Sequence, residues 1–164
     1  MLGVALMALA GAAAPTAVLP LDDIFTTFDQ ICIGHTELAD QKKAAEALPN
    51  VVKEVRPRRD EKTGEEQYPA TIYHGIGFQV GMIGYSENAT CYVTAHIDPA
   101  MDADGLRDAV ATRFAGKPHK AAATKNFYHG GWVTKDQAFE MEWQHKDDGI
   151  VALLSVRRRD GFTK

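Results

Sequence analysis

Charged residues are distributed very unevenly along this chain of 164 residues. All 18 Lys and Arg residues and all 22 Asp and Glu residues lie after Leu21. The 143 residues that follow Leu21 (164 minus 21) thus carry 40 charges (18 plus 22), about 28%, which is ordinary for a soluble domain. The sequence therefore divides into an apolar leader and a chain that we expect to fold as one globular domain.

The apolar leader has the composition of an export signal, with small residues around Ala12 that suit a signal peptidase. We expect a signal peptide over residues 1–17 and a single α+β domain over residues 18–164. An uncleaved membrane anchor is one alternative, because a charge-free stretch of this length can span a bilayer. Pro15 and Pro20 interrupt that stretch, so we expect no stable membrane span after cleavage. An ordered part of the fold is the other alternative.

Composition and motifs exclude several classes of protein. A hydrophobic fraction of 45% excludes a disordered or collagen-like chain, and a net charge of −4 argues against a nucleic-acid partner. The chain has no HExxH, paired CxxC, Gly-x-Ser-x-Gly or Gly-rich phosphate loop before a helix. We therefore expect no cofactor, and the partner is an unidentified protein or small molecule.

The two cysteines both lie on apolar faces of expected elements. Phe25, Phe28 and Cys32 recur at helical spacing, and Cys91 belongs to the apolar side of an alternating strand over residues 90–97. An even pair in an exported protein is more often a disulfide than a reactive thiol. The sequence thus predicts a Cys32–Cys91 disulfide. The rival, a cysteine nucleophile, lacks the cationic surroundings that lower a thiol pKa.

The carboxy-terminal part of the chain predicts a hairpin with a defined register. Residues 137–145 alternate between apolar and polar side chains, and Asp148-Gly149 suits a two-residue turn into the following apolar run. The expected pairs are Trp143 with Leu154, Met141 with Val156 and Glu140 with Arg157. This register matches apolar with apolar and acidic with basic side chains.

Other patterns complete an α+β prediction. Start and stop signals predict helices from Asp22 to Gly34, from Glu37 to Leu48 and from Asp102 to Gly116. Alternation predicts a strand over residues 76–82. An edge strand is expected over residues 51–55, followed by a charged loop over residues 56–67. Residues 119–136 have no clear pattern beyond an expected strand near residues 124–128. We expect an antiparallel sheet built of hairpins, with two or three helices on one face and a single disulfide.

The tripeptide Tyr-His-Gly occurs twice, starting at Tyr73 and at Tyr128, which are 55 residues apart. Chance or shared turn chemistry is one interpretation, and two similar half-sheets, each turning at a glycine, is a second. A third is a Zn or Cu site, because imidazole and carboxylate groups at strand ends suit these metals. Its ligands would be His74, His96, Asp98 and His129.

A few positions suggest a relationship to other proteins. The Ala-rich leader, the Phe25-x-x-Phe28-x-x-x-Cys32 helix, the Cys91 strand and the closing Trp143 hairpin resemble small exported proteins of Gram-negative bacteria to which no activity is assigned. The resemblance implies a periplasmic or secreted α+β domain and carries over no functional residue.

These observations favour a non-enzymatic periplasmic or secreted domain that binds a protein or a small ligand. Its binding surface would be an exposed aromatic patch formed by Tyr73, Tyr85, Tyr128 and Trp132. One alternative is a small metal-dependent hydrolase that uses the histidines and aspartate named above. Another is a secreted inhibitor of a cell-wall hydrolase.

Overall fold

The computed structural model describes residues 17–84, 90–113, 120–124, 127–133, 138–145 and 152–159. The expected leader up to residue 16 lies outside this part of the chain. The helices are α1 (Leu21–Phe28), which continues as a π-helical turn (Asp29–Ile33), α2 (Leu38–Glu46) and α3 (Ala103–Arg113). The strands are β1 (Val52–Arg59), β2 (Glu66–His74), β3 (Phe78–Ile83), β4 (Thr90–Ile97), β5 (Lys120–Thr124), β6 (Phe127–Val133), β7 (Ala138–His145) and β8 (Ala152–Arg159). Within the described ranges, no helix has the length and apolar character needed to cross a membrane.

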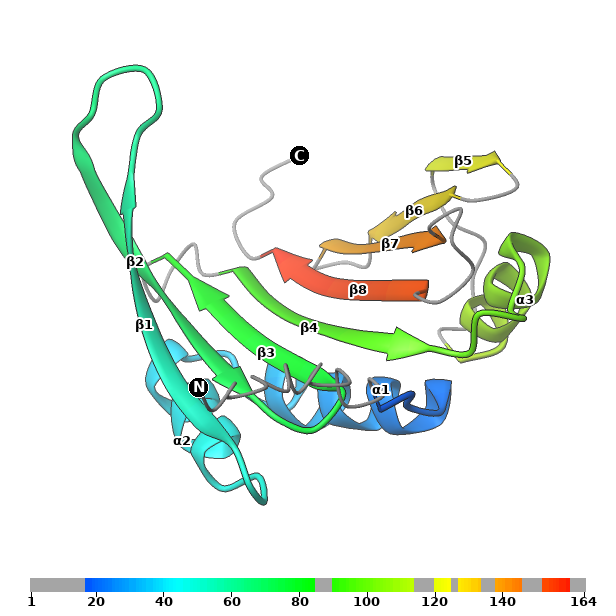
Figure 1. Cartoon of the computed structure of the whole chain (residues 1–164), viewed down its shortest axis with the longest axis horizontal. Helices are drawn as coiled ribbons and strands as arrows, with labels where there is room; N and C mark the ends of the chain where they lie inside the picture. Colours follow the sequence, from blue (N-terminus) through cyan, green and yellow to red (C-terminus); the bar gives the residue numbers. More distant parts are fainter. Residues whose placement is uncertain are drawn as a thin grey trace, which may run out of the picture.

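The strands form one antiparallel sheet in the order β1-β2-β3-β4-β8-β7-β6-β5. In Figure 1 the sheet curves, so that the β1–β2 hairpin rises at one side and β5 and β6 rise at the other, while α1 and α2 lie beneath β3 and β4. The α+β prediction, with an antiparallel sheet and helices against one face, is confirmed.

Helix α1 attaches to the sheet because its apolar side chains share one face. Ile24, Phe25 and Phe28 are buried, and the π-helical turn that follows also buries Ile31 and Cys32. The Cys32–Cys91 disulfide then joins this turn to the central strand β4, with a Cα–Cα distance of 5.5 Å. The predicted disulfide is confirmed, and it lies among the apolar side chains of the core.

The closing hairpin has the register that alternation predicts. Trp143 pairs with Leu154, Met141 with Val156 and Glu140 with Arg157. Met141 and Trp143 are buried, whereas Glu140 is only partly covered. The predicted register is confirmed, whereas the predicted Asp148-Gly149 turn lies outside the described residues. Strand β8 continues the sheet on its other side by pairing with β4.

The predicted charged loop over residues 56–67 is too long, because only residues 60–65 lie outside the strands. These residues form the outer part of the β1–β2 hairpin, which projects beyond the sheet in Figure 1. The turn is stabilised by Asp60, whose carboxylate accepts hydrogen bonds from the backbone N–H groups of Lys62 and Thr63, each at 2.9 Å. The outer strands are exposed on both faces, so they need no apolar alternation, and for this reason the pattern did not reveal them.

The sheet consists of two similar halves, β1–β4 and β5–β8, which meet at the β4–β8 pair. Thr94 and Ser155 are register partners at this junction. Gln79 pairs with Thr94 on one side, as Glu142 pairs with Ser155 on the other. The next partners outward are His74 and His129.

This register makes the two histidines equivalent under a pseudo-twofold axis at the β4–β8 pair. Tyr73 and Tyr128, one residue earlier, are equivalent as well. The register therefore supports the half-sheet interpretation of the repeated tripeptide. The two glycines differ, since Gly75 lies in the turn between β2 and β3 whereas Gly130 lies within β6.

Candidate functional site

The two faces of the sheet differ in chemistry because successive residues of a strand point to opposite sides. One face packs against α1 and carries the buried side chains Val80, Cys91 and Val93. We call the opposite face the polar face. Its described side chains include a row that crosses the strands in register: His74, Gln79, Thr94, Glu142 and His129.

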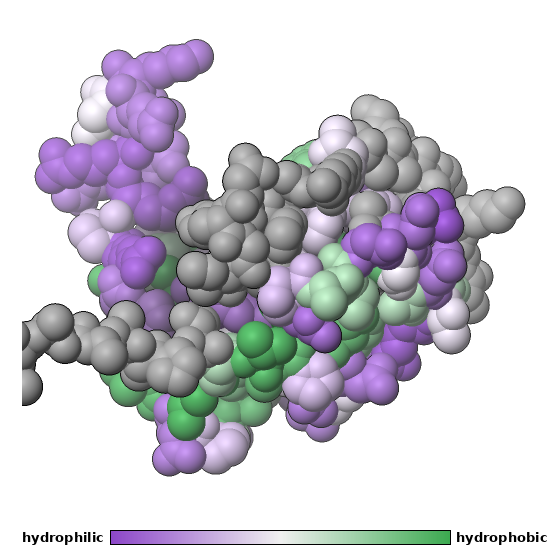
Figure 2. Space-filling model, turned by 45° about the vertical axis from the view of Figure 1, so that its right-hand side comes forward, coloured by the Kyte–Doolittle hydropathy of each residue, from purple (hydrophilic) through white to green (hydrophobic). Residues whose placement is uncertain are grey.

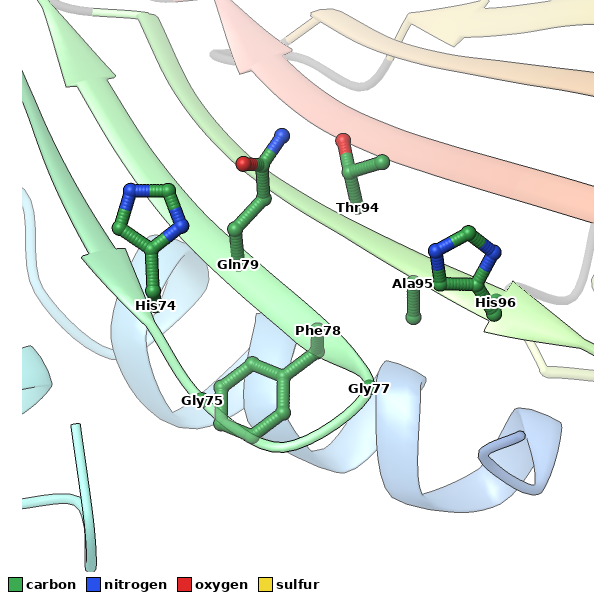
Figure 3. A pocket seen from close by; sticks show the side chains of 8 residues that line it. All are labelled: His74, Gly75, Gly77, Phe78, Gln79, Thr94, Ala95 and His96. Atoms are coloured by element: carbon green, nitrogen blue, oxygen red, sulfur yellow. The ribbon is translucent and has the colours of Figure 1, made fainter. Parts of the chain in front are cut away.

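A pocket opens in this face between the β2–β3 turn and β4. It has a volume of about 280 Å³ and is lined by His74, Gly75, Gly77, Phe78, Gln79, Thr94, Ala95 and His96. Figure 3 shows that the side chains of His74, Gln79, Thr94 and His96 all point to the side of the ribbon away from the helix below, whereas Phe78 points to the helix side. The pocket therefore has a wall of imidazole, amide and hydroxyl groups.

Glycines shape the tight turn beneath the pocket. The Gly75 N–H donates a hydrogen bond to the Phe78 carbonyl at 2.9 Å. A Cβ atom at Gly75 would collide with the Phe78 ring, and Gly77 has a φ of 80°, which favours glycine. The backbone of Ala17 also approaches Gly77 closely, so the segment before α1 lies against this turn.

One wall of the pocket is held by charges. The Nε2 atom of His74 lies 2.7 Å from a carboxylate oxygen of Glu54, and Arg56 Nε donates to the other oxygen at 2.6 Å. Hydrogen bonds from Arg56 and from His74 lower the pKa of Glu54 to about 2. Glu54 is therefore ionised at neutral pH and accepts the Nε2 proton, which fixes the orientation of the His74 ring.

The opposite wall is held by the backbone of β4. The His96 N–H donates to the Gly77 carbonyl at 3.1 Å, and the His96 carbonyl accepts from the Leu19 N–H at 2.8 Å. In the described part of the chain, the buried Nδ1 atom of His96 has no hydrogen-bond partner. An imidazole ring can both donate and accept hydrogen bonds through its two nitrogens, so His96 adds hydrogen-bonding capacity to this wall.

Exposed apolar side chains surround this end of the polar face. Val52 is the register partner of His74, and Ile76 lies in the β2–β3 turn. Val18 directly follows Ala17, whose backbone approaches Gly77. Their exposed fractions are 69%, 70% and 50%, respectively. Figure 2 shows apolar surface in the lower part of the molecule, below the hydrophilic hairpin. Polar groups within an apolar rim are typical of ligand sites.

The predicted metal site does not form. His74 and His96 line the same pocket, but His129 lies on β6, five strands from β2, or ~24 Å along the sheet at ~4.8 Å per strand. The Asp98 carboxylate accepts the Ala100 N–H at 2.8 Å in the loop after β4. Across the described ranges, no group of three or more His, Cys, Asp and Glu side chains could hold a metal ion. Metal ligands need bonds near ~2 Å, which this spacing prevents.

The predicted aromatic surface is also wrong where the structure tests it. The rings of Tyr73 and Tyr128 are buried, at 0% and 1% exposure, because alternation turns each tyrosine toward the core and the following histidine toward the polar face. Tyr85 lies outside the described residues, and only the backbone of Trp132, in β6, is described. These tyrosines therefore stabilise the fold.

Sequence patterns contained a signal for one aromatic residue that was missed. Tyr92 lies between Cys91 and Val93, whose side chains face the core, so its ring must face the polar side. It pairs with Gly81, and a Cβ atom at Gly81 would collide with the Tyr92 ring. The half-buried Tyr92 ring thus lies over a glycine on the polar face. The sequence signal for Tyr92 was an aromatic residue on the polar side of its strand, together with a glycine in the neighbouring strand.

Comparison with family models, with curated proteins and with solved structures finds no match to this chain. The chemistry of the site therefore has to be inferred from its side chains alone. They offer hydrogen-bond donors and acceptors from imidazole, amide and hydroxyl groups, a suitable set for holding a polar molecule.

Proposed function

We propose that the protein is a non-enzymatic domain that binds a small polar ligand in the pocket between the β2–β3 turn and β4. The observation that carries the proposal is the convergence of His74, Gln79, Thr94 and His96 on a cavity of about 280 Å³. Val52 and Ile76 add apolar surface at its rim. A few converging polar groups with apolar surroundings match the usual anatomy of a ligand site.

Binding is favoured over catalysis by the state of the carboxylate next to the pocket. A general acid or base works best when its pKa lies near the working pH. The pKa of Glu54 is about 2, because Arg56 and His74 both donate hydrogen bonds to it. Glu54 therefore serves as a fixed anion that orients His74. The inhibitor hypothesis stays a prediction.

We propose that the domain is exported to the periplasm or secreted. A disulfide at the centre of the core is compatible with an oxidising compartment. The Ala-rich leader and the resemblance to exported proteins of Gram-negative bacteria support the same location.

A fragment screen followed by ligand-observed NMR tests the proposal. We expect polar fragments that bind the wild-type protein to bind Gln79→Ala about tenfold more weakly, because a hydrogen-bonding wall is removed. Gln67→Ala is the matched control, since Gln67 is exposed on the projecting hairpin, where it bonds Asp60 at 3.2 Å. Fragments that bind both variants equally well, or a screen without a single bound fragment, would show that the pocket is not the ligand site.

A further inference from the structure

We infer that the ligand site is double and takes an extended, neutral oligosaccharide. The pocket beside His74 would hold one end of the sugar chain, and a second half-site beside His129 would hold the other. This inference rests on the proposed binding function and deepens it by naming the class of ligand.

The pseudo-twofold register supplies the two half-sites. His74 and Gln79 pair on one side of the junction, and His129 and Glu142 pair on the other. Gln79 and Glu142 have side chains of the same length and shape. His74, Gln79, His129 and Glu142 are all half-buried, so each half-site offers a half-buried imidazole next to a half-buried amide or carboxylate group.

The length of the row indicates an extended ligand. Five strand spacings separate β2 from β6, which corresponds to ~24 Å along the sheet. A compact molecule that fits a cavity of about 280 Å³ would reach only the first half-site. A chain of repeated units matches a face on which the same polar groups recur.

The charge balance of the described side chains favours a neutral ligand. Glu54 is compensated by Arg56 and His74. Within the row, Glu142 is the one carboxylate among the five named side chains, and it accepts a hydrogen bond from the Gln144 amide. The other four are imidazole, amide and hydroxyl groups, and the hydroxyl groups of a sugar can both donate to and accept from these.

The Tyr92 ring and the position of the row in the middle of the sheet favour a sugar over a peptide. The ring lies over Gly81 on the polar face, next to the row, and an aromatic surface suits the apolar C–H groups of a sugar ring. Extended peptides usually bind along the edge of a sheet, where backbone groups are free. The row described here crosses the middle of the sheet, where the strands are already paired with one another.

The test uses the full, oxidised domain with imidazole groups labelled by ¹⁵N-histidine. The probes are chitohexaose, cellohexaose and maltohexaose, each compared with its monosaccharide and with a flexible Gly-Ser peptide. We expect at least one hexasaccharide to shift the signals of both His74 and His129, and to bind at least about tenfold more tightly than its monosaccharide.

Variants of the second half-site make the test specific. His129→Ala and Glu142→Ala should each weaken hexasaccharide binding by about fivefold or more and leave monosaccharide binding at the pocket unchanged. His35→Ala is the matched control, because His35 lies in the loop before α2, outside the sheet. Circular dichroism establishes that every variant is folded.

The outcomes separate this inference from the proposed function. If a sugar shifts His74 and His96 alone, and His129→Ala binds it as the wild type does, the double site is wrong while the binding pocket stands. If every hexasaccharide leaves all histidine signals unchanged, or if only the peptide binds, the oligosaccharide is wrong. Failure of the proposed function is recognised independently, by a fragment screen that yields no ligand sensitive to Gln79→Ala.

Discussion

Glu54 organises the edge of the pocket through two partners, Arg56 and His74. Its pKa in the folded protein is about 2, below the ordinary value of 4.5. A carboxyl group with a lowered pKa stabilises the fold above its unfolded pKa, and that contribution is lost as the pH falls. We predict that the wild type loses this contribution between about pH 4.5 and pH 2.

The variant Glu54→Gln should therefore be less stable than the wild type at pH 7 and equally stable at pH 2, as measured by urea unfolding at both values. Glu66→Gln is the control, since Glu66 is exposed and lies 3.5 Å from Arg59 on the projecting hairpin. It should leave the free energy of unfolding nearly unchanged at both values, because exposed ion pairs contribute little. A constant difference between Glu54→Gln and the wild type across this range would contradict the prediction.

The equivalent tyrosines of the two halves differ in hydrogen bonding. The Tyr73 hydroxyl donates to Glu46 at 3.1 Å, whereas the buried Tyr128 hydroxyl has no hydrogen-bond partner within the described ranges. We predict that Tyr73→Phe lowers the free energy of unfolding by about 1 kcal/mol. Tyr128→Phe should leave it unchanged or raise it slightly, because the substitution removes an unsatisfied polar group.

Chemical denaturation of the two tyrosine variants at neutral pH measures both effects with the same substitution. The ring is kept in each variant, so packing changes little and the hydroxyl is isolated as the cause. Equal losses at the two positions would mean that the Tyr128 hydroxyl is also satisfied in solution.

Among the elements, the π-helical turn and β4 are joined by the Cys32–Cys91 disulfide, which closes a loop with a sequence separation of 59 residues. In the chain-entropy model a loop of this length contributes about 4 kcal/mol of stability. We predict a loss of this order, or somewhat less, for the double variant Cys32→Ala/Cys91→Ala, measured by urea unfolding. Intact mass with and without reductant should differ by about two daltons; an unchanged mass would contradict the disulfide.

Elements with one covered face could be predicted from the sequence. Strand β4 and the β7–β8 register follow from alternation, because the core accepts only one face of each strand. The outer part of the β1–β2 hairpin could not be predicted, because solvent on both sides removes the constraint that produces alternation. Strands β5 and β6 were largely missed, since the runs Ala121-Ala122-Ala123 and Gly130-Gly131 interrupt any alternation of apolar and polar side chains.

The candidate site could be predicted only in part. Histidines 74, 96 and 129 were singled out, and the polar-face row contains two of them. Their grouping was wrong, because spacing along the chain does not reveal which strands lie side by side. Gln79 and Thr94 carry no motif and become part of the site only through the pairing of β3 with β4.

At the scale of the whole molecule, the two halves are joined through β4 and β8, which pair from Thr90–Arg159 to Ile97–Ala152. The first half contains its own helices and both cysteines of the disulfide. A fragment of residues 17–100 would therefore retain much of its core and expose the edge of β4. Exposed edge strands of this kind pair readily with another chain.

We predict that this fragment forms a symmetric dimer through antiparallel β4–β4 pairing, with Thr94 opposite Thr94. The reason is that the pseudo-twofold axis passes through the Thr94–Ser155 pair, so a second copy of β4 can take the place of β8 with the same register. Light scattering should give twice the fragment mass, and Thr94→Cys should form an intermolecular crosslink. The His96 N–H donates to the Gly77 carbonyl on the β3 side of β4, so the N–H of the neighbouring Ala95 points to the opposite side, the free edge. Ala95→Pro removes this backbone donor near the centre of the edge and should yield a monomer. A wild-type fragment that stays monomeric, or whose Ala95→Pro variant still dimerises, would show that the two halves do not share an interchangeable edge.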